Sequence, residues 1–145
     1  MDNKTKIEST WNILQGELFK LTYKRANRAV RAGFYLEAVS LEESLILNRL
    51  EVILLHSAGV RYEYFSVGKA LKNIQSHNVP AMDESLWADC QAWVKRRNNL
   101  SHHFAQVDLE DGLTWRSRIS LARETAVEGI ALANRCSKES RKHKQ

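Results

Sequence analysis

The sequence predicts an all-α protein, an up-and-down bundle of about four long helices with one shorter helix. Apolar residues recur at helical spacing along most of the chain. The 145 residues include only six glycines and one proline, so few turns can form and the helices between them must be long. With 43% hydrophobic and 27% charged residues, the composition is that of an ordinary folded protein. We therefore expect one helical domain over residues 1–145.

The first helix is expected to start at a cap formed by Ser9 or Thr10 and to end near Ala32. Apolar residues at helical spacing mark the side that we expect to face the core. This side consists of Trp11, Leu14, Leu18, Leu21 and Ala29.

Gly33 is expected to separate the first helix from a second one, which runs from Phe34 to about Ala58. Gly59 is suited to the left-handed position that closes such a helix. The second helix is apolar nearly all the way round, and a helix of this kind must lie at the centre of the bundle.

A shorter third helix is expected over Val67 to Gln75, and Asp83 is a good cap for a fourth helix. A fifth helix should run from about Thr114 to Cys136. Residues 137–145 are basic and contain no apolar anchor, so we expect them to form a frayed tail.

Two charges of opposite sign are predicted to point into the core. The fourth helix continues into a dense polar stretch, Lys95 to Phe104, and Arg97 falls in the middle of its apolar stripe. At about 100° per residue, Glu43 projects from the side of the second helix that should be most buried. A buried carboxylate needs a cation or a proton, so we predict that Glu43 pairs with Arg97. A shift of one residue in the helix register would put Glu42 in that place instead.

The net charge of +5 favours a polyanionic partner such as RNA, because clustered cations release counterions when they bind phosphates. Four cations follow one another along one face of the first helix at steps of four, four and three, and two more precede Arg97. These cations are either a solvated surface or a phosphate-binding one. The candidate RNA-binding residues are Lys20, Lys24, Arg28, Arg31, Lys95 and Arg96.

Cys90 and Cys136 lie far apart and lack the spacing of a redox motif, which favours free, buried thiols in a reducing compartment. No apolar run reaches the roughly 18 residues needed to span a membrane. The first residues do not lead into a signal peptide. We therefore expect a cytoplasmic protein with no membrane partner.

The core of the polar stretch, Arg97-Asn98-x-x-x-His102, resembles the signature of the HEPN superfamily (higher eukaryotes and prokaryotes nucleotide-binding). The stretch Gly33 to Ser44 is also similar to the second helix of bacterial members. The resemblance implies an HEPN-like helical fold, a homodimer with a composite active site, and cleavage of RNA that needs no metal or other cofactor. It further implies a role as a toxin or in antiphage defence, with a possible antitoxin as partner. Phe104 stands where many members have a tyrosine that an antitoxin modifies, so another antitoxin, or none, is expected.

In this interpretation, His102 removes the proton from a ribose 2′-hydroxyl, because histidine titrates near neutral pH. Arg97 stabilises the charge on the phosphoryl oxygens, and Asn98 orients His102 or binds phosphate. Ser101 and His103 are supporting residues, and no metal ligands are predicted. Arg97 and His102 differ by about 140° on a straight helix. The helix must therefore turn near Ser101, or Arg97 must curl round, or a second copy must complete the site, which is the most economical solution.

Two other functions remain open from the sequence. The first is a non-catalytic HEPN-like module that binds RNA or a nucleotide through Arg97 and His102. The second is a helical interaction or scaffold protein, in which Arg97 is a core arginine paired with Glu43. His102 would then be a surface histidine near a helix C-terminus, where a cation interacts favourably with the helix dipole.

Overall fold

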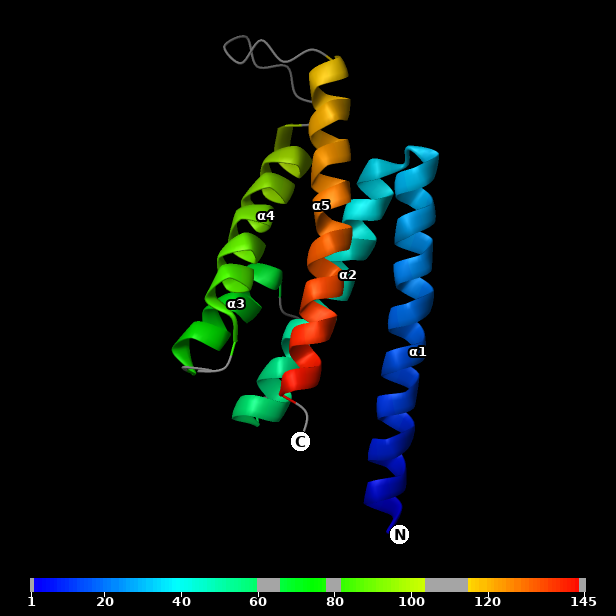
Figure 1. Cartoon of the computed structure of the whole chain (residues 1–145), viewed down its shortest axis with the longest axis vertical. Coiled ribbons are helices and arrows are strands. Elements are labelled where there is room, and N and C mark those ends of the chain that lie inside the picture. Colours follow the sequence, from blue (N-terminus) through cyan, green and yellow to red (C-terminus); the bar gives the residue numbers. More distant parts are fainter. Residues whose placement is uncertain (1, 60–65, 78–81, 104–114, 144–145) are drawn as a thin grey trace.

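The computed structural model describes residues 2–59, 66–77, 82–103 and 115–143. This part of the chain contains five helices and no strand, so the predicted all-α class with four long helices and one short helix is confirmed. Figure 1 shows the helices and their connections. Their bounds are α1 (Asn3–Ala32), α2 (Tyr35–Ala58), α3 (Val67–Ser76), α4 (Glu84–His103) and α5 (Trp115–Lys142).

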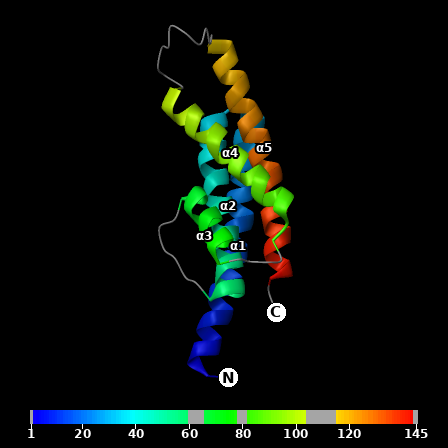
Figure 2. The same ribbon diagram turned by 90° about the vertical axis from the view of Figure 1, so that its left-hand side faces the viewer.

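The centre of the bundle is the contact between α2 and α5, which is the most extensive contact between any two helices described. In Figure 1, α1 rises and α2 descends, while α4 rises and α5 descends. Helix α1 packs on α2 and α5, and α4 packs on α5 and α3. Figures 1 and 2 therefore show α1 and α4 on opposite sides of the central pair. The surfaces of these two outer helices belong to different faces of the protein.

Helix α2 is buried on several sides, as its continuous apolar pattern predicts. Trp93 of α4 is the largest fully buried side chain of the core, and its Nε1 donates a hydrogen bond to the Thr125 carbonyl oxygen at 2.9 Å. Cys90 and Cys136 are free and buried, with their sulfur atoms 3.7 Å apart. The hydrogen bond with Cys90 and burial raise the pKa of the Cys136 thiol, so it stays protonated and unreactive.

The glycines at the ends of the first two helices behave as the sequence predicts. Gly33 and Gly59 have φ values of 84° and 66°, which place both in the left-handed region where glycine is favoured. Helix α1 begins earlier than expected, because the Asp2 side chain accepts a hydrogen bond from the Thr5 backbone N–H at 2.7 Å. The prediction of a cap at Ser9 or Thr10 is wrong, since both residues lie inside the helix.

The expected frayed tail is also wrong for the part of it that the structure describes. Helix α5 continues to Lys142, and Ser137, Glu139 and Ser140 are buried. One Glu139 oxygen accepts a hydrogen bond at 3.1 Å from the Asp83 backbone N–H, at the start of α4. The other forms an ion pair of 3.3 Å with Lys142. Polar contacts, which an apolar pattern does not reveal, hold the end of α5 in the bundle.

The apolar side of α1 mostly faces outward, contrary to the sequence prediction. Leu14, Leu18 and Leu21 are between 51% and 63% exposed, whereas Ala29 is buried as expected. The side of α1 that meets α2 and α5 is instead centred on residues such as Phe19 and Ala26. The beginning of α1 also extends past the lower ends of α2 and α5 (Figure 1). None of the helices described is long and apolar enough to cross a membrane.

Candidate functional site

The residues of the Arg-Asn-x-x-x-His pattern lie on the last turns of α4. The helix continues through Ser101 to His103, so it does not turn away at Ser101. Arg97 and His102 consequently lie on different sides of α4, as expected for a straight helix. The Arg97 side chain is 32% exposed and meets α2, whereas Asn98, Ser101 and His102 are exposed.

The predicted ion pair between Glu43 and Arg97 is present. Arg97 Nη2 lies 2.5 Å from Glu43 Oε2, and the Glu43 side chain is 23% exposed. Arg97 Nη1 also donates a hydrogen bond to Asn98 Oδ1 at 3.2 Å. These two contacts fix the guanidinium against α2 and tie it to the next residue of the pattern. Helix α2 thus holds the Arg97 side chain in one orientation near the C-terminal end of α4.

The most buried carboxyl of α2 is Glu42 rather than Glu43. Glu42 is fully buried, and neither of its carboxyl oxygens has a hydrogen-bond partner among the residues described. Burial raises the pKa of this carboxyl from 4.5 to about 9, so Glu42 keeps its proton at neutral pH. The expectation that Glu43 points to the most buried side is therefore wrong by one residue, although its pairing with Arg97 is right.

Gly129 of α5 makes room for the Glu42 carboxyl. A Cβ atom added at Gly129 would lie 2.7 Å from Glu42 Cδ and 3.1 Å from Trp93 Cζ2. Real side chains do not accept the first of these distances, so only glycine fits beside Glu42 in this packing.

The other sequence-predicted residues do not gather around Arg97. Lys95 is exposed, whereas Arg96 is partly buried and forms an ion pair with Glu128 of α5. The side chain of His103 and the whole of Phe104 lie outside the described residues. Four of the candidate RNA-binding cations are exposed on α1, across the central helices from α4 (Figure 1). These four are Lys20, Lys24, Arg28 and Arg31.

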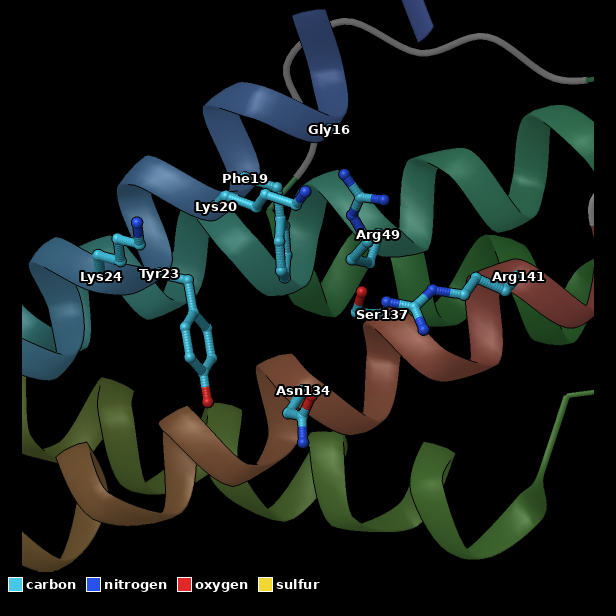
Figure 3. A pocket seen from close by; sticks show the side chains of 9 residues that line it. All are labelled: Gly16, Phe19, Lys20, Tyr23, Lys24, Arg49, Asn134, Ser137 and Arg141. Carbon is cyan, nitrogen blue, oxygen red and sulfur yellow. The ribbon is translucent and has the colours of Figure 1, made fainter. Parts of the chain in front are cut away.

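A cavity of about 340 Å³ lies between α1, α2 and α5, and Figure 3 shows the side chains that line it. Two of the α1 cations, Lys20 and Lys24, reach it, together with Arg49 of α2 and Arg141 of α5. Arg49 and Arg141 were not predicted from the sequence to be site residues. Arg49 lies in α2, the most apolar of the helices described, and a cation in such a helix could have indicated a site.

No group of three or more His, Cys, Asp or Glu side chains within the described ranges is placed to hold a metal ion. No protein-family model, curated protein or solved structure matches this chain. The resemblance to HEPN proteins therefore rests on the Arg-Asn-x-x-x-His pattern and on the helical architecture.

Proposed function

We propose that this protein is a metal-independent endoribonuclease that acts in the cytoplasm as a toxin or antiphage-defence effector. The supporting observation is the ion pair that fixes Arg97 to Glu43 near the end of α4, close in sequence to the exposed His102. A guanidinium can stabilise charge on the phosphate oxygens and imidazoles can transfer protons, and these two roles are what phosphodiester cleavage requires when no metal takes part. The choice of RNA rests on the resemblance to HEPN ribonucleases.

The reaction removes one proton from the attacking 2′ oxygen and adds one proton to the leaving 5′ oxygen. His102 removes the proton from a ribose 2′-hydroxyl, and the 2′ oxygen attacks the adjacent phosphorus atom. The bond between phosphorus and the 5′ oxygen breaks, and the partner's His102 donates a proton to that oxygen. The products are a 2′,3′-cyclic phosphate and a free 5′-hydroxyl. DNA is not a substrate, because it lacks the attacking hydroxyl.

The composite site requires a homodimer, and the outer face of α4 can provide the contact. Exposed residues follow one another along this face at steps of four and three, and two of them are alanines that allow a second helix to approach closely. A two-fold axis on this face would bring the two His102 side chains together. The residues of the α4 outer face are Ala88, Ala92, Lys95, Asn99 and His102.

The exposed leucines of α1 offer a competing contact. They belong to a row of apolar residues at steps of four and three, which is the spacing of a coiled-coil seam. The row consists of Ile7, Trp11, Leu14, Leu18 and Leu21. A dimer formed through this seam would keep the two His102 side chains apart, because α1 and α4 lie on opposite sides of the bundle. The dimer contact must therefore be located as well as detected.

The activity is tested by incubating the purified protein with single-stranded RNA, and with DNA of the same sequence, in EDTA. We expect RNA cleavage that leaves a 2′,3′-cyclic phosphate. His102→Ala should lower the rate by about 10²- to 10⁴-fold, the range for losing a general acid–base group. His77→Ala, which removes an exposed histidine at the end of α3 outside the proposed site, is the matched control and should keep most of the activity. Equal rates in the wild type and His102→Ala would remove the proposed mechanism.

The location of the dimer contact is tested by sedimentation of two single variants. One introduces a carboxylate on the α4 outer face, and the other introduces a carboxylate among the exposed leucines of α1. Ala92→Glu should dissociate the dimer and abolish cleavage, whereas Leu18→Glu should leave both unchanged. If Leu18→Glu alone dissociates the protein, the two His102 side chains do not share a site. RNA binding without cleavage by the wild type would favour a non-catalytic RNA-binding module instead.

A further inference from the structure

The cavity between α1, α2 and α5 has a strongly cationic lining. Its lining includes Lys20, Lys24, Arg49 and Arg141, and none of the described residues adds a carboxylate to it. Figure 3 shows that the four cations that line it come from three different helices. Like charges gathered in this way repel one another, and an anion in the cavity would relieve that repulsion.

Arg49 is the unusual member of this group. Its side chain is only 6% exposed, and its Nε and Nη2 atoms have no hydrogen-bond partner within the described part of the chain. The guanidinium carbon lies 4.3 Å from the centre of the Phe19 ring, and this cation–π contact holds it in place. Burial and the nearby charge of Arg141 lower the pKa of Arg49. A buried guanidinium that feels the like charge of another guanidinium is costly unless a ligand compensates it.

We propose that this cavity, the basic pocket, binds a multiply charged phosphate group. Two arginines and two lysines exceed what a single carboxylate can neutralise, and guanidiniums bind phosphate oxygens with paired hydrogen bonds. Ser137 and Asn134 add uncharged donors to the same lining. The volume of about 340 Å³ is at the small end of ligand pockets, which suits a nucleoside phosphate or one phosphorylated unit of an RNA strand.

The basic pocket is separate from the proposed nuclease site. Its residues belong to α1, α2 and α5, whereas Arg97 and His102 belong to α4. Phosphate binding in the pocket therefore does not depend on cleavage, and His102→Ala should bind as the wild type does. A protein without nuclease activity could still have this site.

Calorimetric titrations of the full chain with inorganic pyrophosphate, ADP and a short single-stranded RNA test the proposal. Two double variants are compared, and each replaces two cations by alanine, so both lower the net charge by the same amount. Lys20→Ala with Arg141→Ala changes two pocket residues, while Arg28→Ala with Arg31→Ala changes two exposed cations of α1 outside the pocket. We expect the first variant to weaken pyrophosphate binding by at least about tenfold, the effect of one lost charge-assisted hydrogen bond. The second should change it by less than about twofold.

The three probes distinguish the source of the phosphate. Tight binding of pyrophosphate or ADP indicates a free nucleotide or polyphosphate, whereas binding of RNA alone indicates the phosphates of a strand. Either result supports the pocket if the loss is confined to the first variant. Equal losses in the two double variants would overturn the proposal, because they indicate general attraction to a basic surface. Failure of the wild type to bind any of the three probes would also overturn it.

Arg49→Met gives a second readout that does not rely on surface charge. Methionine is unbranched, flexible and uncharged, so it can fill much of the space that the aliphatic part of Arg49 occupies beside Phe19. We expect the variant to fold and to lose pyrophosphate binding. Retained binding in a folded Arg49→Met protein would contradict the role given to the buried guanidinium.

Discussion

Helix α2 places charged residues inside the bundle in two regions, and the two regions differ in how these charges are balanced. Toward its beginning, Glu43 pairs with Arg97, and the neighbouring Glu42 is sealed against α5 with its proton retained. About two turns further along, Arg49 is nearly as buried, but the like charge of Arg141 acts on it and lowers its pKa. The first region is neutral by itself, whereas the second has an excess of positive charge.

This difference indicates what each region requires. Around Arg97 the carboxylate of Glu43 already supplies the counter-charge, so the pair can position a guanidinium without a ligand. Around Arg49 the described residues supply no such carboxylate to the cavity, and the proposed ligand would bring the counter-charge. Substitutions at Gly129, at Glu42 and at the two arginines test this comparison.

The largest effect is expected from Gly129→Ala, which should lower the free energy of unfolding by about 3 kcal/mol, the upper end of the usual cost of overpacking a core. The added Cβ would lie 2.7 Å from Glu42 Cδ, and neither α5 nor the buried Trp93 beside it can easily move away. Urea denaturation measures the loss. Combining the change with Glu42→Ala should recover part of it, because the opposing carboxyl is then absent.

Gly16→Ala is the matched control for Gly129→Ala. Nothing lies within 4 Å of a Cβ atom added at Gly16, which is also inside a long helix. This change should raise stability by about 1 kcal/mol, because alanine favours the helix over glycine. A loss at Gly129 no larger than the effect at Gly16 would show that Glu42 is not packed as described.

The next effect is the pH dependence that Glu42 confers. Its pKa is about 9 in the folded protein against an ordinary value of 4.5, so between these values the unfolded chain releases a proton that the folded chain keeps. Stability therefore falls as pH rises from about 4.5 to 9, by roughly 3 kcal/mol at pH 7. Glu42→Gln should remove this slope and raise stability at pH 7 by a similar amount. Urea denaturation at pH 5, 7 and 9 measures both, and an unchanged slope would contradict a buried neutral Glu42.

The sequence predicted the parts of this structure that follow from apolar spacing. The five helices and the Glu43–Arg97 pair follow from a pattern that repeats every 3.6 residues, and the two glycine ends follow from the left-handed conformation that glycine favours. The same pattern could not separate Glu42 from Glu43, because neighbouring residues differ by only about 100° and α2 is buried on several sides.

The pattern failed where tertiary contacts decide the outcome. It assigned the leucines of α1 to the core, but α1 turns a different side to α2 and α5. It left the end of α5 frayed, because the contacts of Glu139 with the start of α4 are polar. The basic pocket was missed for the same reason, since Arg49 and Arg141 meet only when α2 and α5 pack together.

The smallest effects, about 1 kcal/mol each, should have opposite signs at the two arginines. Arg97→Met leaves Glu43 partly buried without its cation and should lower stability. Arg49→Met removes a buried charge for which the described helices provide no carboxylate partner and should raise stability, even though the contact with Phe19 is lost. Urea denaturation in low-salt buffer measures both changes. Adding pyrophosphate should then stabilise the wild type and Arg97→Met but not Arg49→Met, because only a protein that binds the ligand gains from it. Losses at both arginines would mean that an acceptor within the protein already compensates Arg49, and that the regions of α2 around Glu43 and Arg49 do not differ in charge balance.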